Sequence, residues 1–223
     1  MTDITITPQA LRARLRLEAL SGVAWLPTTA VPKTAESLPM TLAEWAQTAA
    51  ACRACRLCEG RRTVVFGEGD ATARLMFVGE GPGAEEDLQG RPFVGPAGVL
   101  LTKMIQALKL TREQVYIANT VKCRPPNNRP PQPDELAACR RYLDAQLALI
   151  RPRVVCALGR TAANALLNTE QPLGALRGRP HTVGEIPVIV TYHPAHLLRH
   201  PEAKRDAWAD LQRLFPYLRE DTP

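Results

Sequence analysis

Four short runs of apolar residues divide the chain, and each is the uninterrupted kind of run that forms a strand buried on both faces. They occupy residues 74–79, 115–119, 153–158 and 186–191. Stretches with helical periodicity separate or follow them, at about 97–109, 133–150, 160–167 and 202–215. This alternation predicts an α/β fold with three layers, α/β/α, in which helices cover both faces of a four-stranded, mostly parallel sheet.

The N-terminal part of the chain follows a different pattern. Residues 8–21 predict an amphipathic helix with leucines on one side and arginines on the other. Residues 25–39 hold three prolines and three threonines without a period, which indicates a linker. A short helix should follow, with Thr41 as its N-cap and Glu44 completing a capping box. We therefore expect an N-terminal helix and Pro-rich linker over residues 1–45 and one globular domain over 46–223.

The loops after the predicted strands are the places to look for chemistry. In open α/β sheets, ligands bind beyond the carboxyl ends of the strands. Here those segments are residues 79–98, 119–133, 159–160 and 191–199.

Composition narrows the class of protein. The chain has 223 residues, 45% of them hydrophobic, which is enough for a buried core. No run approaches the roughly 18 apolar residues of a membrane span, and the first residues resemble no secretory signal. We expect a soluble, cytoplasmic protein with no membrane partner. Its net charge of +6 permits an acidic partner such as nucleic acid without identifying one.

The six cysteines are too few for a secreted disulfide scaffold, so their clustering indicates metal binding or redox chemistry. Cys52, Cys55 and Cys58 have the spacing of the first three ligands in a bacterial ferredoxin. Arg62 stands where the fourth ligand would fall, which argues against a ferredoxin.

A better set of ligands joins Cys52 and Cys55 to the distant Cys123 and Cys139. Four thiolates in two pairs suit either a tetrahedral zinc ion or a cubane iron–sulfur cluster, and spacing alone does not choose between them. Cys156 lies within an apolar run and is expected to be a buried small hydrophobe. Cys58, described above, is either a spare thiol or a substitute ligand.

The segment Gly79–Ala84 formally fits the dinucleotide fingerprint G-x-G-x-x-A after a strand. The match is weak because the next strand ends in Asn119 rather than in an acidic residue. The acidic residues 85–87 would also repel a pyrophosphate. Dinucleotide binding is therefore not expected.

Four motifs at the ends of predicted strands carry a more specific resemblance. They are Gly79-Glu80-Gly81-Pro82-Gly83 with Glu86-Asp87, Gly90-Arg91-Pro92-Phe93-Val94-Gly95, Asn119 before Lys122-Cys123-Arg124-Pro125-Pro126-Asn127-Asn128-Arg129, and Tyr192-His193-Pro194-Ala195. Read together, over about residues 50–215, they resemble the family 4 (thermostable-type, iron–sulfur) uracil-DNA glycosylases. The resemblance implies a DNA repair hydrolase that removes uracil, and a [4Fe–4S] cluster held by Cys52, Cys55, Cys123 and Cys139.

The resemblance also implies roles for residues around a flipped uracil. The amide of Asn119 would donate to O4 of uracil and accept from N3–H, a pattern that cytosine reverses. Phe93 would stack on the base, and His193 would donate to O2 as the uracil anion leaves. Gly79 and Gly81 would complete the loop that binds the substrate.

The group that positions the attacking water is less well defined. Gly81 stands where the best-known uracil-DNA glycosylases carry an aspartate, so Glu80 is our candidate, with Asn128 and Asp87 in reserve. When the bond breaks with oxocarbenium character, positioning the attacking water matters more than removing its proton. The missing aspartate therefore does not exclude hydrolysis.

Two segments are expected to contact DNA. By resemblance, residues 195–199 form the wedge that fills the gap left by the flipped base, through Leu197, Leu198 and Arg199, although the leucines could equally belong to the core. Arg129 would contact phosphates. So would its neighbours Arg124, Arg140 and Arg141.

The predicted activity is monofunctional, which means base removal without strand cleavage. Strand cleavage would need a lysine nucleophile, and none is evident: Lys122 is the single lysine in the motif loops. We expect a monomer that acts on uracil-containing DNA, single- or double-stranded. The alternative is a non-enzymatic nucleic-acid-binding module with a four-cysteine zinc site. A third possibility, an iron–sulfur electron carrier, lacks any second cofactor motif.

Overall fold

The computed structural model describes residues 40–219. The helix predicted at residues 8–21 and the linker at 25–39 lie outside this range, so they stay predictions, as does the domain division at residue 45. The first described helix, α2 (Leu42–Ala50), starts as expected. The N–H of Thr41 donates to Glu44 Oε2 over 2.7 Å, and the N–H of Glu44 donates to Thr41 Oγ1 over 3.3 Å, which is the predicted capping box.

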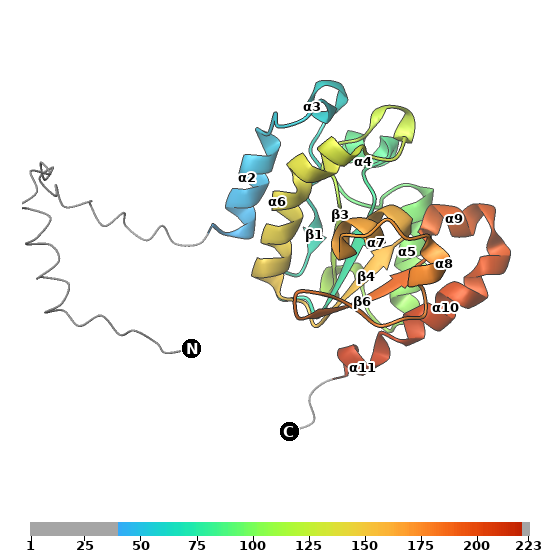
Figure 1. The fold of residues 1–223 in the computed structure, drawn as a ribbon. Coiled ribbons are helices and arrows are strands. Elements are labelled where there is room, and N and C mark those ends of the chain that lie inside the picture. The colour runs from blue at the N-terminus through green and yellow to red at the C-terminus, as the bar shows by residue number, and fades with distance from the viewer. Residues whose placement is uncertain (1–39, 220–223) are drawn as a thin grey trace, which may run out of the picture. The chain divides into compact units, whose positions relative to one another are not determined.

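A mostly parallel sheet occupies the middle of the described structure, in the strand order β1-β3-β2-β4-β6-β5 (Figure 1). Its four central strands are parallel to one another. They are β2 (Leu75–Gly79), β3 (Tyr116–Asn119), β4 (Val154–Leu158) and β6 (Ile186–Thr191). These four coincide with the four predicted apolar runs, and the α/β fold class is confirmed.

Two short edge strands bring the sheet to six strands within residues 40–219. β1 (Glu68–Gly69) pairs antiparallel with β3, and β5 (His181–Val183) pairs antiparallel with β6 through a turn at Gly184, where φ is +56°. The sequence pattern predicted neither strand. Both are partly exposed and too short to form a buried apolar run.

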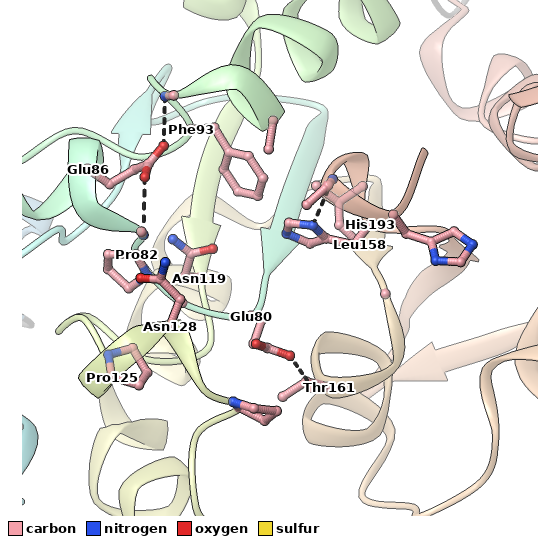
Figure 2. A pocket seen from close by; sticks show the side chains of 18 of the residues that line it. Glu80, Pro82, Glu86, Phe93, Asn119, Pro125, Asn128, Leu158, Thr161 and His193 are labelled. Carbon is pink, nitrogen blue, oxygen red and sulfur yellow. Dashed lines mark hydrogen bonds between the residues drawn. The ribbon is translucent and has the colours of Figure 1, made fainter. Parts of the chain in front are cut away.

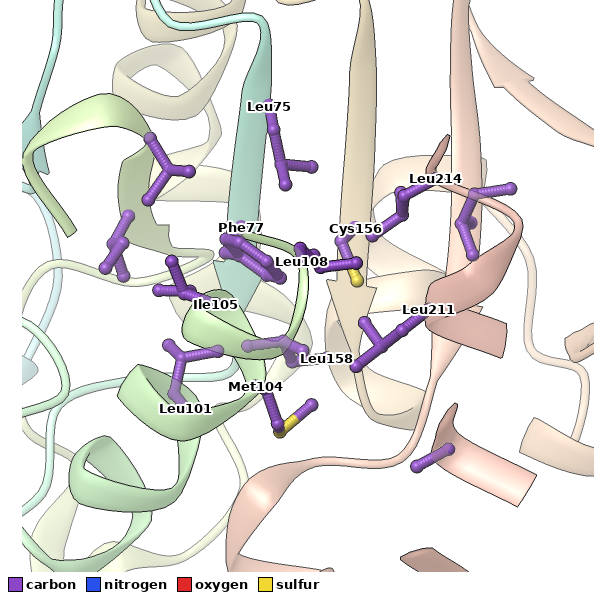
Figure 3. Packing of buried hydrophobic residues seen from close by; sticks show 14 of the residues in the cluster. Leu75, Phe77, Leu101, Met104, Ile105, Leu108, Cys156, Leu158, Leu211 and Leu214 are labelled. Atoms are coloured by element: carbon purple, nitrogen blue, oxygen red, sulfur yellow. The ribbon is translucent and has the colours of Figure 1, made fainter. Parts of the chain in front are cut away.

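Successive strand residues point to opposite sides of the sheet, and in the central strands the residues on both sides are buried. Helices therefore cover both faces. One face packs against α5 (Pro96–Ala107), α9 (Pro194–Arg199), α10 (Lys204–Gln212) and α11 (Phe215–Leu218). Figure 3 shows this cluster, with Phe77 of β2 and Cys156 of β4 beside Ile105 and Leu211 from the helices. The other face packs against α6 (Pro133–Ile150), α7 (Arg160–Leu167) and α8 (Leu173–Leu176).

Smaller elements complete the chain between these helices and strands. They are α3 (Leu57–Gly60), α4 (Ala84–Gln89), and the 3-10 turns η1 (Arg112–Gln114), η2 (Pro126–Asn128) and η3 (Pro201–Ala203). A third apolar cluster lies between α2 and α6, where the rings of Trp45 and Tyr142 meet edge to face with centroids 5.9 Å apart. Within the described range, no helix is both long and apolar enough to span a membrane.

Candidate active site

A cavity of about 810 Å³ opens where the four parallel strands end, and its lining comes from all four loops that the sequence singled out (Figure 2). The predicted site residues on its wall are Glu80, Gly81, Phe93, Asn119, Asn128, Arg129, His193 and Arg199. They come together because the carboxyl ends of parallel strands share one edge of the sheet.

Asn119 forms part of the cavity wall at the end of β3, where its side chain is almost fully buried, with 1% of the residue exposed. Its Oδ1 atom has no hydrogen-bond partner among the described residues. Leaving such an acceptor unpaired costs about 1–3 kcal/mol. The site is therefore suited to a ligand that brings an N–H to this atom.

Gly79 does not line the cavity, but it makes room for the residues that do. A Cβ at this position would overlap Asn119 Oδ1 and would lie 2.8 Å from Cε2 of Phe93. The missing side chain thus allows the amide and the ring to pack over the end of β2. The loop role predicted for Gly79 stays a prediction, and its observed contribution is space.

The ring of Phe93 lies to one side of the gap that separates the amide of Asn119 from the imidazole of His193 (Figure 2). Its centroid is 5.6 Å from that of His193, with the two planes tilted by 34°. The backbone of Phe93 has φ +52°, in the left-handed region that large residues rarely occupy. An aromatic face beside a buried amide is suited to a flat heterocycle.

His193 is the N-cap of α9, and its Nδ1 accepts the N–H of Ala195 over 3.1 Å. That bond leaves the proton of the neutral ring on Nε2. Burial lowers the pKa of His193 to about 4, and the Arg199 guanidinium acts in the same direction. At neutral pH the ring is therefore an uncharged donor through Nε2.

Glu80 reaches the cavity from the side opposite Phe93 (Figure 2). One carboxylate oxygen accepts the hydroxyl of Thr161, in the first turn of α7, and its backbone oxygen accepts the hydroxyl of Thr120. The second carboxylate oxygen has no hydrogen bond within residues 40–219. That oxygen is free to hold a water molecule.

The two reserve groups for the water differ in position. Asn128 lines the cavity, and its Oδ1 accepts Nε of Arg124 over 2.8 Å, which leaves its NH₂ group as a donor. Asp87 is buried outside the cavity lining, where its Oδ1 accepts the N–H groups of Arg62 and Thr63. Asp87 therefore holds a loop, and the idea that it positions water is wrong.

Glu86 holds two loops of the cavity together, a function that the sequence analysis missed. Its Oε1 accepts the N–H groups of Val94 and Gly95, both over 2.9 Å, and its Oε2 accepts the N–H of Gly83 over 3.1 Å. The Gly-rich loop and the Phe93 loop are thereby joined. The available signal was its position as the third residue of a helix after a glycine N-cap.

The predicted wedge is divided between core and surface. Leu197 is only 2% exposed and packs with the core, so the prediction that it contacts DNA is corrected. Leu198 is 45% exposed, and its role as the wedge stays a prediction. On a helix, neighbouring residues point about 100° apart, which separates the two leucines.

The arginines predicted to contact phosphates differ in whether a protein carboxylate already holds them. Arg129 makes a two-pronged ion pair with the buried Glu135, over 2.6 and 2.8 Å, and so braces its own loop. Arg140 is paired with Asp144 over 2.6 Å. By contrast, the described residues offer no hydrogen bond or ion pair to Arg199, nor to Arg160, a cavity residue that the sequence analysis did not single out.

Five of the six cysteines surround a second, smaller cavity between α2, α3 and α6. They are Cys52, Cys55, Cys58, Cys123 and Cys139. No cluster of three or more Cys, His, Asp and Glu in the described range is placed to hold a single metal ion. Cys156 lies apart, fully buried in the sheet core, as predicted.

The second cavity places hydrogen-bond donors against three of its sulfur atoms, while burial raises the pKa of the Cys139 thiol to about 11. Arg61 donates to Cys123 Sγ over 3.2 Å, the N–H of Lys122 donates to Cys139 Sγ over 3.3 Å, and Arg141 donates to Cys52 Sγ over 3.5 Å. Metal-bound cysteines are thiolates, and hydrogen bonds donated to their sulfur atoms stabilise them. The residues therefore fit an iron–sulfur cluster.

Lys122 lies between the two cavities and lines only the smaller one. Its ammonium group donates to the backbone oxygen of Asn119 over 2.9 Å and to Gln146 Oε1 over 2.6 Å. Burial lowers the pKa of Lys122 to about 8. Lys122 therefore supports the strand end that carries Asn119, and it does not enter the larger cavity as a nucleophile.

Comparison with known proteins agrees with this geometry. The family model described as the uracil DNA glycosylase superfamily matches residues 66–212. The type-4 uracil-DNA glycosylase of Thermotoga maritima is 45% identical over 174 residues, covering 76% of this chain and 91% of that protein. The type-4 enzyme of Saccharolobus solfataricus is 43% identical, covering 73% and 80%. A type-5 uracil-DNA glycosylase of Thermus thermophilus is 36% identical, covering 54% and 69%.

Proposed function

The chain belongs to the uracil-DNA glycosylase superfamily and is a type-4 member of it, and we propose that its larger cavity excises uracil from DNA. The reaction hydrolyses the N-glycosidic bond and leaves an abasic site. The observation that carries this assignment is the buried, unpaired Oδ1 of Asn119 beside the ring of Phe93. The alternative of a non-enzymatic zinc module is not favoured.

The cavity is suited to uracil rather than cytosine through Asn119. The N3–H of uracil satisfies the unpaired Oδ1 atom, and the amide NH₂ group donates to O4. Cytosine would place an acceptor against Oδ1 and a donor against the NH₂ group. Each such mismatch costs roughly 1–3 kcal/mol, which favours uracil strongly.

Cleavage of the bond uses His193 and Glu80 on two sides of the nucleotide. As the bond between C1′ and N1 breaks, its electron pair moves onto uracil, and Nε2–H of His193 donates to O2 of the resulting anion. Because His193 is uncharged at neutral pH, it stabilises the anion as a hydrogen-bond donor. A water held by Glu80 adds to C1′ and loses one proton to solvent, and the departing uracil anion takes up one proton from solvent.

The smaller cavity is proposed to hold a [4Fe–4S] cluster through Cys52, Cys55, Cys123 and Cys139. When bound, such a cluster would supply a rigid cross-link between segments that are far apart in sequence. Cys123 follows Lys122, whose side chain holds the backbone of Asn119. The cysteine region thereby supports the strand end that reads uracil.

Arg160 and Arg199 line the cavity, are exposed, and have no hydrogen-bond or ion-pair partner within residues 40–219. They are proposed to contact DNA phosphates, and Leu198 is proposed to fill the gap left by the flipped base. A basic rim should make binding weaken steeply with salt, because phosphate contacts release counterions.

We further propose that the protein acts as a monomer, which size-exclusion chromatography at several concentrations can test.

The function is tested by incubating the full chain with single- and double-stranded oligonucleotides that carry one uracil, followed by alkali to cleave abasic sites. Strand cleavage after alkali, and none in matched oligonucleotides with cytosine or thymine, is the expected result. Absence of product from both uracil substrates would overturn the proposal.

The cluster is tested separately by iron analysis and visible absorption of the purified protein. About four irons per chain are expected, with loss of iron in Cys55→Ser and retention in Cys58→Ser, a matched control from the same cavity wall. Zinc without iron would overturn the cluster, and loss of iron in Cys58→Ser would overturn the ligand set.

A further inference from the structure

We propose that Arg112, which does not line the larger cavity, is a positioning residue for uracil because it fixes the loop that carries Phe93. This inference rests on the proposed function and on the stacking role of Phe93. Arg112 begins η1 and follows Phe93 by 19 residues in the sequence. Its side chain is nonetheless largely buried, with 16% exposed.

The guanidinium of Arg112 holds two successive carbonyl groups at the tip of the Phe93 loop. Nη2 donates to the oxygen of Pro92 over 2.8 Å, and Nη1 donates to the oxygen of Phe93 over 3.0 Å. Nη1 also lies 3.3 Å from the hydroxyl of Thr102, on α5. One side chain thus fixes the orientation of the peptide groups on both sides of Phe93.

A second residue keeps the guanidinium in place. Glu68, on the edge strand β1, accepts Nη2 of Arg112 at Oε1 over 2.6 Å and Nε of Arg91 at Oε2 over 2.8 Å. Arg91 is 62% exposed and makes no hydrogen bond to either loop carbonyl. The two arginines therefore share one carboxylate, and of the two only Arg112 donates to the carbonyl groups on either side of Phe93.

The loop needs such support because its conformation is unfavourable by itself. Phe93 has φ +52°, and a residue of this kind persists in the left-handed region only where its surroundings determine it. Its carbonyl group lies against Gly98, where any Cβ would overlap the carbonyl carbon and oxygen. Arg112 supplies, through Nη1, the hydrogen bond that this carbonyl group accepts in that position.

Without the guanidinium, the two carbonyls lose their donors and Phe93 can return to an ordinary backbone conformation. Its ring would then leave its place beside Asn119 and His193. Stacking acts on the bound base before and during the reaction, so its loss should raise KM and leave kcat nearly unchanged. A change in KM with little change in kcat distinguishes a positioning residue from one that acts in the bond-breaking step.

The test is a double-mutant cycle of Arg112→Met and Phe93→Ala, measured as KM and kcat on a single-stranded uracil oligonucleotide. Arg112→Met should raise KM by about fivefold to a hundredfold, the range for loss of one base–aromatic stack. Added to Phe93→Ala, it should cause no further change. Arg112→Lys, which can reach one carbonyl, should recover part of the loss. Glu113→Gln, a control at the exposed neighbour of Arg112 in η1, should leave KM unchanged.

Independent, additive effects of the two substitutions would overturn the proposal, as would an unchanged KM in Arg112→Met. Melting temperatures show whether a variant is folded, and if Arg112→Met is not, the same cycle is run with Arg112→Lys and with Glu68→Gln. Failure of the wild-type protein to excise uracil would instead overturn the proposed function, so the two failures are distinguishable.

Discussion

Replacing Glu86 with glutamine should loosen two loops of the active site at once. The carboxylate accepts three backbone N–H groups, from Gly83, Val94 and Gly95. Glutamine has a single acceptor oxygen, so at least one of these groups would face an NH₂ group instead. The hydrogen bonds that remain would also be weaker, because the glutamine amide is uncharged.

The magnitude follows from these contacts. A hydrogen bond to a charged group contributes about 1.5–3 kcal/mol to stability. Glu86 is partly exposed, so each of its hydrogen bonds contributes less than it would if fully buried. We expect Glu86→Gln to lower the free energy of unfolding by about 1–3 kcal/mol and to raise KM, because the Phe93 loop is one of the two that it holds.

Urea unfolding and steady-state excision kinetics measure the two effects. Glu85→Gln is the matched control, since Glu85 is the exposed neighbour on the same helix and should change stability by less than about 0.5 kcal/mol. If Glu86→Gln were as stable and as active as this control, the reasoning from the three N–H contacts would be refuted.

Three more predictions follow from the same geometry. Gly79→Ala should abolish most excision, because its Cβ would collide with Asn119 and Phe93; normal kinetics in the folded variant would contradict this. Lys122→Met leaves two buried acceptors unpaired and should cost about 2–4 kcal/mol in urea unfolding; a cost below about 1 kcal/mol would count against it. The pKa of His193 is about 4, below its unfolded value, so the unfolded state binds more protons and stability should fall as pH drops from about 6.5 towards 4. Urea unfolding across that range should show a smaller loss for His193→Gln, and an equal loss would exclude His193 as the cause.

Much of the architecture could be predicted because the four central strands are buried on both faces. Each therefore appears in the sequence as an uninterrupted apolar run, and the order of strands and helices follows from them. The loops after these strands meet at one edge, which brought Glu80, Phe93, Asn119 and His193 to a single cavity. The edge strands β1 and β5 escaped prediction because they have no buried run.

The residues that support the site could not be predicted in the same way. Arg112 acts on Phe93 from 19 residues away, and its partner Glu68 lies 44 residues before it. No local pattern marks such pairs, since they depend on how loops pack in space. Arg129 shows the same limit, because its sequence context suggested DNA while the buried carboxylate of Glu135 already holds its guanidinium.

The most direct test of the account is the base selectivity of Asn119→Asp. The substitution keeps the size of the side chain and replaces the NH₂ donor with an acceptor, so the N4 amino group of cytosine gains a partner in the cavity. Asn128→Asp, in the same cavity wall, is the matched control. We predict that Asn119→Asp excises cytosine from single-stranded DNA whereas the wild type and the control do not. Unchanged selectivity for uracil in the folded variant would contradict the claim that Asn119 reads the base.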